Sequence, residues 1–158
     1  MKDLKSIYWL ENKTSNLMNI KNDVLKIYTD GASRGNPGPA SYGFVFRFDD
    51  DGEVLKEKGF LGKTTNNRAE YNAVIHALEK AEDFTDNIVE VYSDSKLLVN
   101  QVSGRWRVKN QELRKLFKHV KDAEEAFEKV SYTHVRRSNK FVSKADKLCN
   151  NVLDQEGF

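Results

Sequence analysis

The sequence predicts an α/β protein built around a mixed β-sheet. Residues 24–28 form an apolar run that ends in an acid and a turn rich in Gly and Pro, which is typical of a strand. Residues 41–48 and 53–60 are two further strand patterns around Gly52, and they predict an antiparallel hairpin. Residues 87–94 form a later strand, which follows a helix. A strand reached through a helical crossover pairs in parallel, so we expect it beside the first strand.

The length of the chain predicts one folded domain with an N-terminal leader. At 158 residues the chain is long enough for one substantial core. Residues 1–23 are mostly polar and rich in Asn and Lys, and we expect a leader that is partly ordered or flexible. Tyr8 and Trp9 leave a second interpretation open, in which they stack on nucleic-acid bases. Residues 24–158 are expected to form the domain.

Charge and composition argue against a protein with a basic surface all round, a disulfide-bonded protein and a membrane-spanning protein. The formal net charge is +2, so any surface for nucleic acid has to be local. The single cysteine, Cys149, excludes an internal disulfide and suits a reducing compartment. No apolar run approaches the length of a membrane span. We therefore expect a cytoplasmic monomer without a membrane partner.

Two of the predicted strands end in an aspartate. Asp30 stands between the first apolar run and the glycine-rich turn, and Asp94 closes the strand over residues 87–94. Adjacent parallel strands bring their carboxyl ends to one edge of a sheet, where α/β proteins bind their ligands. We therefore expect Asp30 and Asp94 to lie close together. Taken alone, Asp30 could equally be an ordinary turn residue.

Two further acids fall on predicted helices. Asn67 and Glu70 form the pattern of a capping box at the start of a helix whose alanines recur every four residues. Glu70 also shares a helix row with Val74 and Leu78, so we expect its carboxylate to face partly towards the core. Asp146 lies on the last predicted helix, one step round from its apolar stripe.

Gathered in one place, four carboxylates would repel one another strongly. The set Asp30, Glu70, Asp94 and Asp146 therefore predicts a site that divalent cations neutralise. Hard oxygen ligands favour Mg²⁺ or Mn²⁺, and two such ions about 3.5–4 Å apart suit an in-line phosphoryl displacement. The scattered histidines and the single cysteine do not support a zinc site.

Basic segments are candidates for phosphate contacts. Arg105, Trp106 and Arg107 interleave basic and aromatic side chains ahead of a long amphipathic helix. A solvent-exposed charged face explains the basic residues of that helix equally well. Arg136 and Arg137 lie in a basic loop after the last predicted strand.

In its motifs and in their order, the chain resembles type 1 ribonuclease H. The matching segments are Tyr-Thr-Asp-Gly-Ala with Gly-Asn-Pro-Gly-Pro, Thr-Thr-Asn-Asn-Arg-Ala-Glu-Tyr, Tyr-Ser-Asp-Ser, and His134 leading to Ala145-Asp146. Any one segment is weak support, whereas all four in the family's order, over about residues 24–155, are highly specific.

This resemblance implies a fold and an activity. The fold is a five-stranded mixed sheet, with three antiparallel strands followed by two parallel strands and flanking helices. Residues 24–158 would be the catalytic domain. The implied activity is endonucleolytic cleavage of the RNA strand of RNA/DNA hybrids, which leaves 5′-phosphate and 3′-hydroxyl ends. The implied cofactor is Mg²⁺ or Mn²⁺, with two ions per active site.

The resemblance also implies roles for individual residues. The metal ligands correspond to Asp30, Glu70, Asp94 and Asp146, with Asp30 bridging both ions. The positions that contact the hybrid, partly through RNA 2′-hydroxyls, correspond to Asn36, Thr65, Asn66 and Asn67. Amides and hydroxyls suit this task, because a 2′-hydroxyl both donates and accepts hydrogen bonds.

The chain departs from the family's pattern at three places, of which one, Lys96 at a position that is often glutamine, carries no functional inference. Enterobacterial members carry a basic helical protrusion, whereas here Asn110 leads directly into the long helix. We therefore expect a compact, archaeal- or bacterial-like form. Its hybrid binding would depend more on Arg105, Trp106, Arg107, Arg136 and Arg137. The loop from His134 to Asp146 is longer than usual, so a catalytic histidine, a nearby arginine and a merely packing histidine all stay open.

Two other functions stay open on the sequence alone. One is a nuclease on the same scaffold that acts on duplex RNA or as an exonuclease. The Thr-Thr-Asn-Asn segment argues against it, because these side chains can read 2′-hydroxyls. The other is a non-catalytic nucleic-acid-binding module. A pure binder would gain nothing from a repulsive acidic cluster that faces phosphates.

Overall fold

A computed structural model describes residues 24–48 and 52–158. The leader expected over residues 1–23 lies outside these ranges, as does the stacking role considered for Tyr8 and Trp9.

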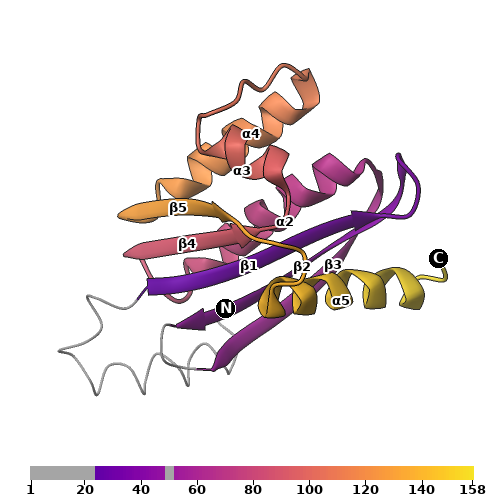
Figure 1. The fold of residues 1–158 in the computed structure, drawn as a ribbon, viewed down its shortest axis with the longest axis horizontal. Coiled ribbons are helices and arrows are strands. Elements are labelled where there is room, and N and C mark those ends of the chain that lie inside the picture. Colours follow the sequence, from indigo (N-terminus) through magenta and orange to yellow (C-terminus); the bar gives the residue numbers. More distant parts are fainter. Residues whose placement is uncertain (1–23, 49–51) are drawn as a thin grey trace.

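Five strands form a single mixed sheet in the order β3-β2-β1-β4-β5 (Figure 1). β1 (Val24–Ser33), β2 (Gly38–Phe48) and β3 (Glu53–Thr64) pair antiparallel. β4 (Ile88–Ser93) pairs parallel with β1, and β5 (Lys129–His134) pairs parallel with β4. The prediction of three antiparallel strands followed by two parallel strands is confirmed.

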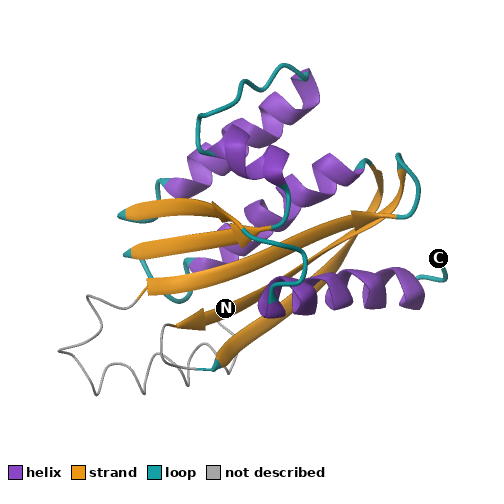
Figure 2. Cartoon of the chain, viewed as in Figure 1, coloured by secondary structure: helices purple, strands orange, loops and turns teal. Residues whose placement is uncertain are grey.

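Helices cover both faces of the sheet (Figure 2). α2 (Asn66–Ala81), α3 (Lys96–Val102) and α4 (Gln111–Glu124) lie on one face. α5 (Lys140–Gln155) lies on the opposite face, against β1, β2 and β3. The two helices that carry candidate acids, α2 and α5, therefore approach β1 from opposite sides.

The main core fills the space between the sheet and α2, α3 and α4. Alternate residues of a strand point to the same face, so β1 buries Leu25 and Ile27 while β2 buries Phe44 and Phe46. A smaller cluster on the other face, formed by Tyr28, Val45 and Val142, packs beneath α5. β1 is thus covered on both faces, which holds its side chains rigidly in place.

The start of α2 differs from the prediction. Its N-cap is Thr65, whose side-chain oxygen accepts a hydrogen bond from the backbone N–H of Arg68 at 3.2 Å. Asn67 therefore lies inside the first turn, and Glu70 lies beyond the third helical position that a capping box requires. The predicted cap at Asn67 was wrong. The segment Thr64-Thr65-Asn66-Asn67 contains four consecutive residues of types that cap helices, and the sequence does not show which of them is used.

Residues 103–110, between α3 and α4, contain no helix. Asn110 is the N-cap of α4, and its side chain accepts from the backbone N–H of Leu113 at 3.0 Å. The prediction that the long helix begins directly after Asn110 is confirmed. Among the described helices, none combines the length and the apolar character needed to cross a membrane.

Candidate active site

The site begins where β1 and β4 part. Their parallel pairing ends at Tyr28 and Tyr92, whereas β1 continues beside β2 as far as Ser33. Asp30 therefore lies within β1, two residues beyond the last parallel pair, and not at the strand end that the sequence suggested. Asp94 directly follows β4. Both aspartates stand at the carboxyl end of the parallel pair, as expected.

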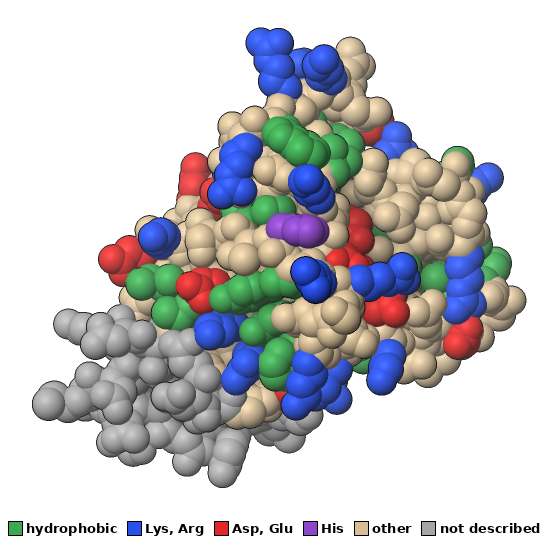
Figure 3. Space-filling view, viewed as in Figure 1, with side chains coloured by type: hydrophobic (Ala, Val, Ile, Leu, Met, Phe, Trp, Pro, Cys, Tyr) green, Lys and Arg blue, Asp and Glu red, His purple; other side chains and the backbone are tan. Residues whose placement is uncertain are grey.

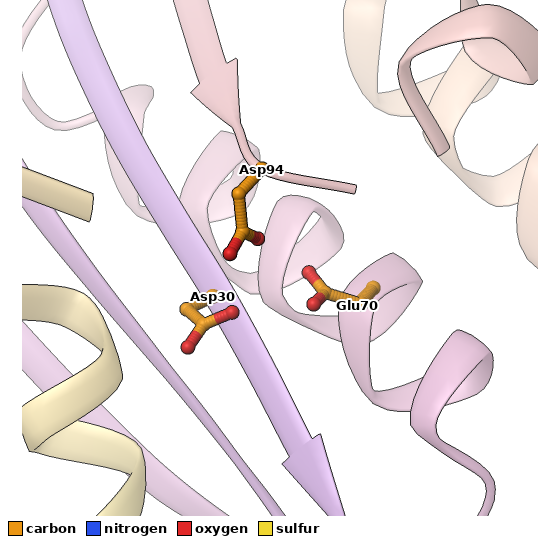
Figure 4. A group of neighbouring side chains, drawn as sticks. All are labelled: Asp30, Glu70 and Asp94. Atoms are coloured by element: carbon orange, nitrogen blue, oxygen red, sulfur yellow. The ribbon is translucent and has the colours of Figure 1, made fainter. Parts of the chain in front are cut away.

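Glu70 reaches the same place because α2 packs very closely on β1. A Cβ atom at Gly31 would lie only 2.3 Å from the backbone carbon of Ala69 and 2.4 Å from the backbone nitrogen of Glu70. Only glycine permits this approach. Carboxylate oxygens of Asp30, Glu70 and Asp94 all lie within 4.8 Å of one another (Figure 4).

Asp146 joins these acids from the opposite face of the sheet. Its carboxyl group lies near enough to raise the pKa of Asp30, and it lines the same pocket, which has a volume of about 400 Å³. It does not belong to the tight group formed by the other three carboxylates. The structure therefore brings all four predicted acids to one pocket, and oxygens of three of them lie within 4.8 Å of one another.

The surroundings of the acids favour their neutral forms. Burial, together with the charges of Asp94 and Asp146, raises the pKa of Asp30 from its ordinary value of 3.8 to about 8. Burial, followed by the charges of Asp30 and Asp94, also holds the pKa of Glu70 well above its usual range, although the backbone amide of Gly31 partly offsets this. Such a cluster is stable with its charges only if cations accompany it.

The donor set of the site fits a hard divalent cation. Glu70 Oε2 is buried and has no hydrogen-bond donor among the described residues. That atom, with the neighbouring oxygens of Asp30 and Asp94, offers the all-oxygen environment that Mg²⁺ and Mn²⁺ prefer. The carboxylates therefore fit the ions that the sequence predicted.

Of the four amide and hydroxyl residues expected to contact the hybrid, two are joined by a hydrogen bond. The side-chain oxygen of Asn36, in the turn after β1, accepts from the backbone N–H of Asn66 at 3.1 Å. Asn66 also lines the acidic pocket, whereas Asn67 is exposed beside it in the first turn of α2. Thr65 uses its hydroxyl oxygen as the helix cap and keeps its O–H proton available for donation.

The basic loop after β5 contributes one arginine to the pocket. Arg137 lines the pocket and lowers the pKa of Asp94, although burial outweighs it and the net shift is upward. Arg136 is exposed and is not among the residues that line the pocket. His134, at the end of β5, places Nε2 3.2 Å from the backbone carbonyl oxygen of Asp94. In the space-filling view, Lys and Arg side chains and one histidine surround acidic side chains near the middle of this face (Figure 3).

The second basic segment forms a groove of its own. Trp106 and Arg107 line a cavity of about 550 Å³ with Lys109 and Arg114. Arg105 is exposed in the same segment. These residues do not line the acidic pocket, so the predicted binding residues are not gathered around a single cavity.

Arg34 and Asn150 are among the residues of the acidic pocket that sequence reasoning did not predict as site residues. The guanidinium of Arg34 pairs with Asp154 at 2.8 Å and donates to Asn150 Oδ1 at 3.2 Å. Asn150 follows Asp146 by one helical turn, and this spacing could have revealed it. Arg34 had no local signal, because its partners lie more than a hundred residues away in α5.

Comparison with solved structures defines the class of fold. The crystal structure of RNase H1 from the halophilic archaeon Halobacterium salinarum NRC-1 superposes with a TM-score of 0.79 at 41% identity, over 84% of this chain and 98% of that chain. LC11-RNase H1 in complex with RNA/DNA hybrid gives 0.78 at 34% identity, over 84% and 98%. The mixed sheet with its flanking helices is thus that of the ribonuclease H-like class.

Sequence comparison narrows the class to a family. A family profile described as "Reverse transcriptase-like" matches residues 28–152. The Ribonuclease H of Chlorobium chlorochromatii is 35% identical over 136 residues, which cover 82% of this chain and 89% of that protein. The Ribonuclease HI of Halobacterium salinarum is 42% identical over 127 residues, which cover 80% and 63%. The chain belongs to the ribonuclease H family.

Some of these relatives are considerably longer. The matched region spans 63% of the Halobacterium protein and 35% of the Bifunctional protein Rv2228c of Mycobacterium tuberculosis.

Proposed function

We propose that the protein is a metal-dependent endoribonuclease that cleaves the RNA strand of RNA/DNA hybrids and leaves 5′-phosphate and 3′-hydroxyl ends. One observation carries the proposal. Asp30, Glu70 and Asp94 offer carboxylate oxygens within 4.8 Å of one another, in a pocket that Asn66 also lines. This arrangement sets a cation site beside groups able to recognise a ribose.

The carboxylates would hold two ions of Mg²⁺ or Mn²⁺. Asp30, Glu70 and Asp94 would bind one of them, and Asp30 would share the second with Asp146, which lines the same pocket. When bound, such ions lower the pKa of a water molecule and stabilise the charge that develops on a leaving oxygen. The raised pKa of Asp30 supports this assignment, because it reflects burial first and then the negative charges of Asp94 and Asp146, both of which a bound cation would offset.

Side chains beside the pocket would select RNA over DNA. The Asn36–Asn66 hydrogen bond fixes the turn after β1 against the start of α2. The amide group of Asn66, the hydroxyl of Thr65 and the exposed amide of Asn67 can then both donate to and accept from a 2′-hydroxyl. A deoxyribose would leave these groups without that partner.

Two groups on the β5 side would assist the reaction. Arg137 brings a fixed positive charge to the pocket beside Asp94, where negative charge gathers on a phosphate. His134 Nε2 faces a backbone carbonyl, which can only accept, so this nitrogen carries the proton of that contact. The other ring nitrogen, Nδ1, is then left to accept and return a proton.

The groove around Trp106 would hold a more distant part of the hybrid. Arg107, Lys109 and Arg114 offer positive charge for phosphates, and the half-exposed ring of Trp106 offers a stacking or sugar-contact surface. Arg105 and Arg136 are exposed and would add further phosphate contacts. The similarity to LC11-RNase H1, which is described in complex with RNA/DNA hybrid, supports this substrate.

The remaining proposals concern the domain boundaries, the oligomeric state and the cellular compartment. We propose that residues 24–158 form the catalytic domain behind an N-terminal leader of residues 1–23. We further propose that the protein acts as a monomer in the cytoplasm. The lone cysteine, which is free and buried, suits a reducing compartment.

A substrate panel tests the proposal. Labelled RNA/DNA hybrid, duplex RNA, duplex DNA and single strands are each incubated with Mg²⁺, Mn²⁺ or EDTA. We expect cuts only within the RNA of the hybrid, products that carry 5′-phosphate, and complete inhibition by EDTA. Cutting of duplex RNA or of DNA ends would replace the proposal with a different nuclease. Hybrid binding without any cutting would leave a binding module.

A further inference from the structure

A buried glutamine joins the helix of Glu70 to the groove around Trp106. Gln101, on α3, is only 5% exposed. Its side chain lies between two polar groups that belong to different segments of the chain. The residue also lines the groove, together with Trp106 and Arg107.

The first of these groups is on α2. Tyr71, the residue after Glu70, is 1% exposed and donates its hydroxyl proton to Gln101 Oε1 at 2.6 Å. A buried hydroxyl that loses its partner keeps the full desolvation penalty, so this bond has to be made for α2 and α3 to pack as they do.

The second group belongs to the segment 103–110. Gln101 Nε2 donates to the backbone carbonyl of Arg107 at 3.4 Å. Bridging a hydroxyl donor and a carbonyl acceptor requires one side chain with both an acceptor and a donor, and an amide supplies both. A hydrocarbon of similar length, as in methionine, supplies neither.

Other contacts hold this segment on either side of Arg107. The backbone N–H groups of Arg105 and Trp106 donate to the carbonyl oxygen of Asn100 at 2.9 and 3.0 Å. On the far side, Arg114 Nε donates to the carbonyl of Val108 at 2.7 Å. Among the described residues, Gln101 provides the side-chain hydrogen bond to the carbonyl of Arg107, which lies between those two anchors.

We propose that Gln101 is a positioning residue for hybrid binding. Its amide sets the Trp106–Arg107 part of the groove at a fixed place relative to α2, and hence to the acidic pocket. One rigid duplex that touches both surfaces requires them to keep a constant separation, and the Tyr71–Gln101–Arg107 connection provides it. This inference rests on the proposed function.

The position of Trp106 can be measured without any activity. The chain has two tryptophans, so a Trp9→Phe background leaves Trp106 as the only one. In the full-length protein, Gln101→Met is expected to raise the acrylamide quenching constant of Trp106 about twofold, because the segment becomes more mobile. Tyr71→Phe removes only the first hydrogen bond, and we expect a smaller increase.

Tyr132→Phe is the matched control. Tyr132 also packs against the main core and donates a hydrogen bond of the same length, 2.6 Å, but to Glu124. Its removal should leave the quenching of Trp106 unchanged. Equal effects of the two tyrosine substitutions would mean that core stability alone moves Trp106, and the proposal would be wrong.

Steady-state kinetics on RNA/DNA hybrid provides the second readout. Losing a buried hydrogen bond corresponds to about a fivefold change in an equilibrium, so we expect KM to rise about fivefold in Gln101→Met while kcat stays within about twofold. A lower kcat with unchanged KM, or unchanged quenching in a folded variant, would overturn the proposal.

If circular dichroism shows that Gln101→Met does not fold, the quenching and kinetics of Tyr71→Phe decide the outcome. A wild-type protein that neither binds nor cuts hybrid would refute the proposed function. The acrylamide quenching of Trp106 would still show whether Gln101 fixes the position of that residue.

Discussion

Asp30 in β1 lies directly opposite Gly43 in β2, and this pairing sets how closely α5 approaches the sheet. A Cβ atom at Gly43 would lie 2.7 Å from the backbone oxygen of Ala145 and 2.8 Å from Leu148 Cβ. The helix therefore rests on β2 at the point where no side chain intervenes. Asp146 follows Ala145 directly, so the absence of a side chain at Gly43 lets its carboxylate reach Asp30.

Gly43→Ala should weaken the fold because the new methyl group meets the backbone of α5. We expect the free energy of unfolding to fall by about 1–3 kcal/mol, which is the usual effect of overpacking. Urea denaturation followed by circular dichroism measures it. Gly52→Ala is the control, since a Cβ atom there meets nothing within 4 Å and should change stability by less than about 0.5 kcal/mol. Equal stabilities for both variants would contradict the packing argument.

Asp30→Asn should abolish cleavage and preserve binding. The substitution keeps the shape of the side chain but removes a negative charge from the group of three carboxylates. We expect the cleavage rate to fall by roughly a thousandfold or more, as for removal of a central active-site group, with hybrid affinity within about threefold. Gel-shift and cleavage assays on the same hybrid measure both. Asp122→Asn, at an exposed ion pair with Lys118 on α4, is the control and should remain active. A fully active Asp30→Asn protein would show that the assigned ligand is wrong.

Stability without metal should decline as the pH rises. The pKa of Asp30 is about 8 in the folded protein, against an ordinary value of 3.8. Between pH 4 and pH 8 the folded state therefore binds more protons than the unfolded state, and the free energy of unfolding falls with pH. The slope is at most about 1.4 kcal/mol per pH unit for each such carboxyl.

Urea titrations in EDTA at several pH values measure this decline. Asp30→Asn should reduce the slope, and saturating Mg²⁺ or Mn²⁺ should flatten it, because bound cations keep the carboxylates charged in the folded state. A free energy of unfolding that stays constant from pH 5 to pH 8 in EDTA would contradict the pKa that burial gives Asp30.

Arg137→Gln should raise the pKa of Asp94, because the guanidinium of Arg137 lowers it in the native protein. Carbon-detected NMR titration of the Asp94 carboxyl group in metal-free protein measures the change. The neighbouring Arg136 does not line the pocket, so Arg136→Gln is the control and should leave the titration of Asp94 unaltered. An identical response to both substitutions would show that the effect is one of net charge alone.

Local patterns in the sequence were sufficient to place the first strands and to bring Asp30 and Asp94 to one edge of the sheet. A strand, a helical crossover and a second strand place Asp30 and Asp94 at one edge, whatever the detail of the turns. The position of Asp30 within β1 could not be predicted. It depends on β1 keeping one neighbour, β2, after it loses the other, β4.

Contacts between segments far apart in the chain could not be predicted from the sequence either. The ion pair of Arg34 with Asp154 and the bridge from Tyr71 to Gln101 leave no periodic signal in the sequence. The two candidate binding surfaces were predicted as residues, but not as separate places. Their separation depends on how α3 and residues 103–110 pack against α2.

The parting of β1 from β4 has a consequence for how a ligand would arrive. The ladder between the two strands ends at Tyr28 and Tyr92, one residue before β4 itself ends, and this leaves a wedge at the acidic pocket between segments that are each held by other partners. A phosphate could enter such a wedge without breaking any ladder hydrogen bond and without the swing of a covering loop. The rate of association should therefore follow diffusion and ionic strength rather than a slow opening of the protein.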